Sequence, residues 1–102
     1  MLPFEEAEGF DWDSGNVLKV WDKHKVLPSE CEQVFANTTF GGRPDKNHSA
    51  RENRHILFGK TNEGRLLTVV DTIRKGKIRV ISPRPMSRKE REKYEQAIAA
   101  NT

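Results

Sequence analysis

The sequence has 102 residues, of which 34% are hydrophobic and 32% charged. This length suits one small domain, so we expect a single domain over residues 1–102 with its core in about 10–95. The single cysteine, Cys31, excludes an intrachain disulfide and a zinc site built from several cysteines. No apolar run approaches the length of a membrane span and no signal-peptide pattern opens the chain, so we expect a cytoplasmic protein without membrane contact.

The net charge of +3 hides an uneven distribution along the chain. The first thirteen residues contain five acids and no lysine or arginine. Residues 74–93, by contrast, contain nine basic side chains against Glu90 and Glu92. Such a stretch indicates a polyanionic partner, with nucleic acid as the first candidate, or else an ordinary solvated face. Charge alone leaves both interpretations open.

A first helix is predicted to start after Asp13 or Ser14, whose side chains can accept hydrogen bonds from first-turn amides. A short edge strand could precede it at residues 10–12. Residues at helical spacing give the helix one inner face: Val17, Val20, Trp21 and His24. We expect both tryptophans, Trp12 and Trp21, to pack in the core rather than stack on RNA.

A second, short helix is predicted from Pro28. Ser29 and Glu32 have the spacing of a capping box, and Cys31 is expected to be a small packing residue. Residues 41–53 contain glycines, a proline and almost no apolar side chain, which predicts a long loop.

Strand pairing is predicted to begin at residues 54–59, with a turn at 61–64. Residues 64–85 then indicate two strands joined by a tight turn at Lys75-Gly76. Pro83 and Pro85 are expected to end the last strand, because proline cannot donate to a ladder.

Strict alternation in that last strand sets Ile78, Val80 and Ser82 against Lys77, Arg79 and Ile81, so one face of the sheet must carry basic groups. No acid in the same strand is placed to pair with Arg79, which favours a functional role over a structural one.

A capping box at Ser87 and Glu90 begins a final helix, whose inner side is expected to carry Tyr94, Ala97 and Ile98. The predicted class is α+β: two N-terminal helices, an antiparallel β-meander sheet of three to four strands, and a C-terminal helix.

The residue types narrow the chemistry. The histidines lack close ligand spacing, and no nucleophile motif or glycine-rich nucleotide loop is present, so we expect no metal and no cofactor. What remains is a set of arginines, the Lys23-His24 pair and a carboxylate. These types suffice for RNA cleavage without metal, since histidine serves as acid or base and arginine binds phosphate. His24 is equally explained as a cation at a helix end.

Four stretches, in this order, resemble the BrnT family of bacterial type II toxin–antitoxin systems: FDWDSGNVLKVWDKHKV, EQVF, TNEGRLLTVV and KIRVISPRPMSRKEREKYE. The resemblance covers roughly residues 10–95. It implies a RelE-like fold and an RNA-cleaving toxin that inhibits translation. It also implies a BrnA-type antitoxin with a ribbon-helix-helix part. The toxin–antitoxin complex would then bind operator DNA only through the antitoxin. The sequence departs from the family at Lys25, where glycine is usual, and at Pro83, where alanine is usual.

Carried over by position, the family's polar residues fall on Lys23, His24, Glu52, Arg54, Arg65, Arg79 and Arg84. The side chains expected to bind RNA are Arg65, Lys77, Arg79, Arg84 and Arg88. Arg91 and Lys93 are expected to be solvated or to face the antitoxin, and His48 and His55 to be incidental.

Two other functions compete with the ribonuclease toxin. One is a non-catalytic member that keeps only the antitoxin contact or binds nucleic acid. The other is a DNA-binding regulator, which ranks last because the sequence lacks a helix-turn-helix or other reading element.

Overall fold

The computed structural model describes residues 7–37, 40–44 and 54–100. The elements follow one another as α1 (Ser14–His24), α2 (Pro28–Ala36), β1 (Phe40–Pro44), β2 (Arg54–Lys60), β3 (Leu66–Arg74), β4 (Lys77–Pro85) and α3 (Arg88–Ala100). The strands form one antiparallel sheet in the order β1-β2-β3-β4. The predicted α+β class is confirmed. None of the described helices is long and apolar enough to cross a membrane.

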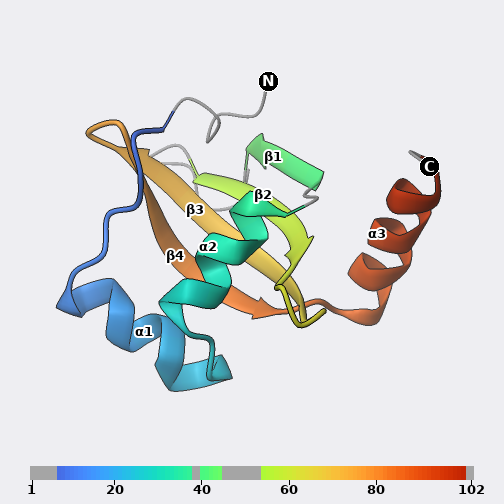
Figure 1. The fold of residues 1–102 in the computed structure, drawn as a ribbon, viewed down its shortest axis with the longest axis horizontal. Helices are drawn as coiled ribbons and strands as arrows, with labels where there is room; N and C mark the ends of the chain where they lie inside the picture. The colour runs from blue at the N-terminus through green and yellow to red at the C-terminus, as the bar shows by residue number, and fades with distance from the viewer. Residues whose placement is uncertain (1–6, 38–39, 45–53, 101–102) are drawn as a thin grey trace.

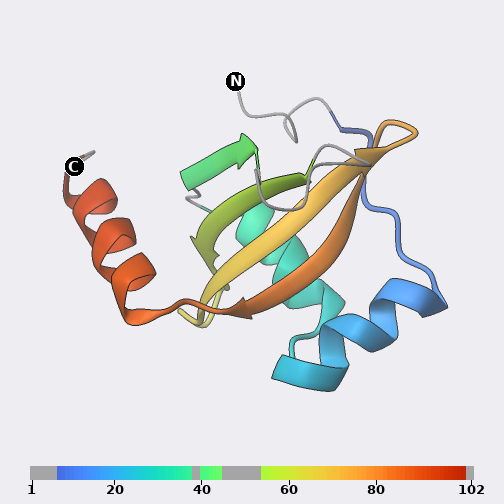
Figure 2. The same cartoon turned by 180° about the vertical axis from the view of Figure 1, so that it is seen from behind.

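The two N-terminal helices and the C-terminal helix take different positions around the sheet. Helix α2 lies across one face, and α1 lies beside β4 (Figure 1). Seen from behind, no helix of the described residues crosses the opposite face, and α3 stands beyond the end of β4 (Figure 2). The core lies between the sheet and the first two helices and consists of Val20, Val26, Cys31, Val34, Leu67, Val69 and Val80.

The start of α1 is fixed by the predicted cap. The Asp13 side chain accepts hydrogen bonds from the Gly15 and Asn16 amides, and the Asn16 side chain accepts one from the Asp13 amide. Asn16 is buried and also donates to the Val80 carbonyl at 3.4 Å, which ties α1 to β4. Trp12 packs against the core as predicted, but the prediction for Trp21 was wrong, because 45% of its surface is exposed.

The cap of α2 differs from the prediction. The Leu27 amide donates to Glu30 Oε1 at 2.9 Å, so the capping contact starts two residues earlier than the Ser29–Glu32 spacing suggested. It is one-sided, because the leucine side chain has no acceptor. Glu32 instead accepts a hydrogen bond from the Trp12 indole at 2.8 Å. Cys31 is buried as expected, and desolvation raises the pKa of its thiol to about 12, so it is a packing residue.

The predicted hairpin is confirmed, with β3 and β4 joined at Lys75 and Gly76. Both turn residues have positive φ, 52° and 79°, as a type I′ turn requires. The strict alternation predicted for β4 was wrong, however. Asp71 pairs with Val80 and Val70 with Ser82, so Ile81 is an extra residue in β4.

This bulge decides which residues share a face. It moves Ser82 and Arg84 to the same face as Lys77 and Arg79, whereas uninterrupted alternation would have separated Arg84 from Arg79. The apolar positions shift accordingly, since Val80 and Pro83 are both buried. The basic face predicted for the sheet therefore extends along the whole of β4.

Two further predictions about the strands were wrong. Pro83 does not end β4, because it pairs in register with Val69, whereas Pro85, which pairs with Leu67, is the last residue of the strand as predicted. They are tolerated because β4 is the outer strand of the sheet, where proline nitrogens need no partner. The predicted loop at 41–53 contains the end of β1, and the rest of it lies outside the described residues. The strand suggested at 10–12 is reduced to a parallel bridge between Phe10 and Ile78.

The C-terminal helix begins as predicted. The Ser87 amide donates to Glu90 Oε1 at 2.8 Å, and the Glu90 amide donates to the Ser87 hydroxyl at 3.2 Å. Tyr94 is buried, and Ala97 and Ile98 are half-buried, in agreement with the predicted inner side.

Candidate functional site

Arg79 on β4 forms a two-pronged ion pair with Asp13, the cap of α1. Nη1 lies 3.0 Å from Oδ2 and Nη2 lies 3.2 Å from Oδ1, while Asp11 Oδ2 lies 3.5 Å from Nη1. These hydrogen bonds lower the pKa of Asp13 and raise the pKa of Arg79. The acidic partners of Arg79 come from the segment before α1 and not from its own strand, so the lack of an acid in β4 was no ground for preferring a functional role to a structural one.

Arg84 forms a second two-pronged pair at the other end of β4. Its Nη1 lies 2.6 Å from Glu90 Oε1 and its Nη2 2.8 Å from Glu90 Oε2. Glu90 also accepts hydrogen bonds from the Thr68 hydroxyl and the Ser87 amide. The Arg84 hydrogen bond is the main reason that the pKa of Glu90 falls to about 2. This pair fastens α3 to β3 and β4.

Arg65, the residue before β3, holds the end of α1. Its Nη2 donates to the His24 carbonyl at 2.8 Å and its Nη1 to the Lys25 carbonyl at 3.0 Å. Nη1 also lies 3.3 Å from Glu30 Oε1. A guanidinium suits this place, because the last carbonyls of a helix lack partners within the helix and carry partial negative charge. Arg65 therefore fixes the backbone that carries His24.

Two adjoining depressions follow α1 along β4. The first is lined by Gly15, Asn16, Lys19, Arg54, Arg79, Val80 and Ile81. The second is lined by Lys19, Asp22, Lys23, His24, Ile81, Ser82 and Pro83. Because Lys19 and Ile81 line both, we treat them as one α1–β4 groove. The groove unites four of the predicted residues, namely Lys23, His24, Arg54 and Arg79.

The strand register explains why Arg54 and Arg79 meet. Thr72 on β3 pairs with Arg54 on one side and with Arg79 on the other, so the two arginines belong to one row on one face of the sheet. Helix α1 contributes the remaining cations from across the groove. Among the described residues, no carboxylate forms an ion pair with Lys19 or Lys23.

Sequence analysis did not single out Lys19, although it lines both halves of the groove. A signal was present, because Lys19 precedes Lys23 by four residues and the two therefore lie on one side of α1. The groove can receive an anionic chain: it offers cations from both walls and a histidine at the end of α1.

Comparison with protein families matches residues 12–90 to the ribonuclease toxin, BrnT, of type II toxin–antitoxin systems. The chain belongs to the BrnT family. The match runs from the residue before the α1 cap to the first turn of α3 and confirms the resemblance drawn from the sequence. A comparison with curated proteins found no match. Family membership implies an RNA substrate and an antitoxin partner.

The residues predicted from the resemblance are distributed over more than the groove in this BrnT member. Arg65 and Arg84 line neither depression, and their guanidinium groups bind Glu30 and Glu90. Glu52 lies outside the described residues. The unusual Lys25 takes the left-handed conformation that glycine would adopt at a helix end, with φ 53° and ψ 50°.

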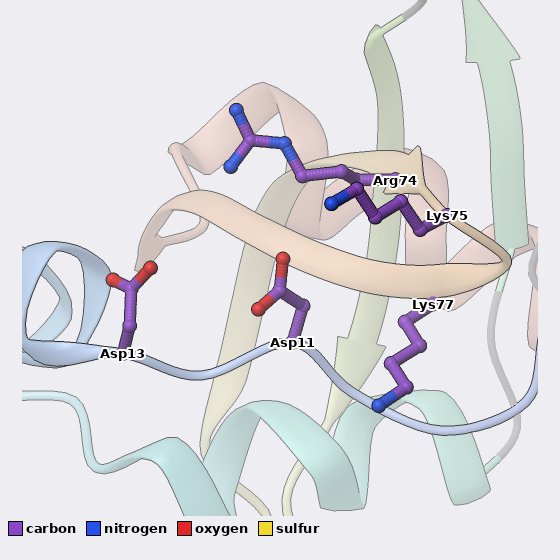
Figure 3. Close-up of a pocket in the computed structure, with 5 residues that line it drawn as sticks. All are labelled: Asp11, Asp13, Arg74, Lys75 and Lys77. Atoms are coloured by element: carbon purple, nitrogen blue, oxygen red, sulfur yellow. The ribbon is translucent and has the colours of Figure 1, made fainter.

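Two further residues predicted to bind RNA, Lys77 and Arg88, also line neither half of the groove. Lys77 is near the β3–β4 turn, where a separate depression is lined by Asp11, Asp13, Arg74, Lys75 and Lys77. Figure 3 shows Asp11 and Asp13 on the segment beside β4, with their carboxylates turned toward the strand. Arg88 is 95% exposed in its side chain, at 3.8 Å from Glu92 on the next turn of α3. The described residues contain no group of three or more His, Cys, Asp or Glu side chains that could hold a metal.

His55 and Asp71 pair across β2 and β3 on the helix-covered side of the sheet. His55 Nδ1 and Asp71 Oδ1 are buried and have no hydrogen-bond partner among the described residues. Burial lowers the pKa of His55 and raises the pKa of Asp71 to about 7. The sequence offered no reason to single out Asp71 as a buried acid.

Proposed function

We propose that this member of the BrnT family is a metal-independent endoribonuclease whose cleavage site is the α1–β4 groove. The observation that carries the proposal is the gathering of Lys19, Lys23, His24, Arg54 and Arg79 along one groove. A row of cations suits the phosphodiester backbone, and a histidine at its end suits proton transfer near neutral pH.

The reaction needs no group beyond these side chains. A base takes the proton of the 2′-hydroxyl, whose oxygen attacks the neighbouring phosphorus. The bond to the 5′-oxygen breaks, and an acid returns a proton to that oxygen, leaving a 2′,3′-cyclic phosphate and a 5′-hydroxyl. His24 and Lys23 are the proposed proton-transfer groups, with Glu52 as a further one, and Arg54 and Arg79 stabilise the negative charge that builds on the phosphoryl oxygens.

The ion pair of Arg79 is compatible with this role. A guanidinium has five N–H donors, and Asp13 accepts two hydrogen bonds from Arg79. The pair therefore orients the guanidinium and leaves donors for a phosphate oxygen. Asp13 thus acts as a positioning residue, since it links the start of α1 to the arginine on the other wall.

The remaining family positions support the site from outside the groove. Arg65 positions His24 through its carbonyl, and Arg84 secures α3 through Glu90. Lys77 and Arg88 are proposed to contact RNA beyond the cleavage site. The cognate antitoxin is proposed to be of the BrnA type, with a ribbon-helix-helix part that alone binds operator DNA, and the toxin is proposed to act in the cytoplasm by inhibiting translation.

The test is cleavage of a defined RNA by the purified protein in the presence of EDTA. We expect cleavage with 5′-hydroxyl products, and its loss in His24→Ala and Lys23→Ala. Lys89→Ala, an exposed change on α3, serves as the matched control. Activity that disappears with EDTA and returns with magnesium would contradict the metal-independent mechanism. No cleavage under any condition would favour the alternative, a non-catalytic module that binds the antitoxin or nucleic acid.

A further inference from the structure

The depression at the tip of the β3–β4 hairpin adjoins the α1–β4 groove. Three cations of the hairpin and two acids of the segment before α1 line it: Asp11, Asp13, Arg74, Lys75 and Lys77. We call it the hairpin depression. Its volume of about 460 Å³ is in the range of small-molecule sites. Arg79 joins it to the groove, because Arg79 lines the groove and pairs with both acids.

The backbone holds Asp11 in a defined place beside the hairpin. The Asp11 amide donates to the Ile78 carbonyl at 2.7 Å, and the Ile78 amide donates to the Gly9 carbonyl at 2.9 Å. The neighbouring Phe10 ring meets Phe35 edge-on, with the ring centres 5.4 Å apart. A carboxylate on a backbone fixed in this way loses little freedom when a ligand binds.

The two acids differ in what they can still bind. Both oxygens of Asp13 accept hydrogen bonds from Arg79, and Oδ1 also accepts from two amides of α1. Asp11 approaches Arg79 through Oδ2, at 3.5 Å, and its side chain is 29% exposed. Its Oδ1 accepts no hydrogen bond from the described residues. Asp11 is therefore the acceptor that the depression offers to a ligand.

The cations of the hairpin have the chemistry to hold a nucleotide beside this acceptor. Arg74 and Lys77 pair across the hairpin, and Lys75 lies in the turn. In Figure 3, Arg74 and Lys75 extend from the turn in the direction of the Asp11 and Asp13 carboxylates. Within the described part of the chain, none of these three cations forms an ion pair. A guanidinium plane can stack on a base, and ammonium groups attract the neighbouring phosphates.

We propose that the hairpin depression is a base-specific subsite for RNA, in which Asp11 binds the Watson–Crick edge of guanine. The proposal rests on the proposed function, because it requires RNA in the adjoining groove. Guanine has two N–H donors, on N1 and N2, side by side on that edge, so both oxygens of one carboxylate can accept from it. Adenine and cytosine offer one amino donor beside a nitrogen acceptor. Uracil offers one N–H between two carbonyl oxygens, which a carboxylate repels.

A second phosphate fits the hairpin depression less well than a base. The Asp11 carboxylate is among its lining side chains and repels an anion, whereas it attracts a base that turns N–H donors toward it. A nucleotide whose phosphate lies at Arg79 can therefore place its base in the adjoining depression.

The test measures binding to probes that cannot be cleaved. The probes are 2′-O-methyl octanucleotides of uridine with one central guanosine, inosine, adenosine or cytidine, or with uridine throughout. We expect the guanosine probe to bind the wild type about tenfold more tightly than the all-uridine probe by fluorescence anisotropy. Inosine lacks the N2 amino group, so its probe should lose most of that gain.

The variant is Asp11→Asn, which keeps the shape of the side chain and replaces one acceptor by a donor. It should reduce the ratio of guanosine to uridine affinity to within about twofold of unity. Glu8→Gln is the matched control, because it removes the same charge from the same segment and Glu8 does not line the depression. Both variants should bind every probe more tightly, since each loses a negative charge, but only Asp11→Asn should change the ratio.

The outcomes separate the subsite from the proposed function. Failure of the wild type to bind any probe would refute RNA binding in the groove and the subsite with it. Equal affinity of the wild type for the guanosine and uridine probes would refute the subsite alone. A guanosine preference that persists in Asp11→Asn would show that Asp11 is not the base-binding group. A preference lost in Asp11→Asn and kept in Glu8→Gln would support the subsite even if the protein cleaves no RNA.

Discussion

The two ends of β4 present the same pair of groups in different surroundings. Arg79 and Arg84 lie on one face, and each holds a carboxylate with both prongs of its guanidinium. The partner of Arg84 also binds Thr68 and caps α3, so that this pair completes a packing contact. Arg79 opens onto a groove that further cations line. The comparison shows that an ion pair alone does not make an arginine structural. Whether the arginine can also bind an anionic ligand depends on the charges beside it.

The largest expected difference between the two ends is in catalysis. Arg79→Ala should slow RNA cleavage a hundred- to thousandfold, which corresponds to about 2 to 4 kcal/mol of transition-state stabilisation, by analogy with loss of an oxyanion donor. Arg79→Lys should restore little, because lysine lacks the planar fork. Melting should change little, since Asp13 keeps its capping bonds and is 54% exposed in its side chain. Single-turnover cleavage and thermal melting of the same variants test this prediction. Full activity of Arg79→Ala would show that Arg79 is not part of the catalytic site.

Arg84→Ala should show the reverse pattern. We expect a loss of about 1 to 2 kcal/mol in the free energy of unfolding, because charge-assisted hydrogen bonds are lost at a partly exposed site, with cleavage largely kept.

The pH dependence of the stability gives a second readout for the Arg84–Glu90 pair. The lowered pKa of Glu90, about 2, contributes stability above its ordinary pKa of 4.5 that disappears as the pH falls through about 2. Denaturant titrations between pH 6 and pH 2 should show a smaller acid loss in the variant; an equal loss would exclude the Arg84–Glu90 pair as its source.

Asp71 extends the comparison to a carboxylate without an arginine. Burial raises its pKa from 3.8 to about 7, so the folded state holds this proton more tightly and stability falls as the pH rises from 3.8 to about 7. Asp71→Asn removes this titration, and we expect it to be more stable than the wild type at pH 8 by on the order of 1 to 2 kcal/mol. At pH 4 the two proteins should be close. Denaturant unfolding at both values checks this, and an Asp71→Asn variant less stable at pH 8 would contradict it.

The smallest expected effect concerns the far wall of the groove. Lys19→Ala should lower kcat/KM for RNA about three- to tenfold, on the order of 1 kcal/mol, because it removes one phosphate contact that does not change in the transition state. The slope of log(kcat/KM) against log salt should become less negative by about 0.7, the value for one phosphate contact to a single strand. Lys89→Ala, on α3, is the control. A Lys19→Ala variant with unchanged salt dependence would place the RNA elsewhere.

The sequence by itself determined the elements whose signals are local. The 3.6-residue period of α1, the capping residues Asp13 and Ser87, and the turn at Lys75-Gly76 act within a few positions of the chain. Four stretches also sufficed to assign the chain to its family. The family resemblance in turn predicted four of the residues that line the groove.

Only the tertiary structure decided how these parts meet. The bulge at Ile81 puts Arg79 and Arg84 on one face. The residue pattern of β4 does not predict this bulge, because a residue is extra only in relation to the pairing with β3. The partner of Arg79 comes from a segment 66 residues away, and Trp21 is exposed because α2 and the sheet already fill the core around Val20. Pairing and burial between residues so far apart depend on which surfaces pack together. A local sequence pattern does not predict that packing.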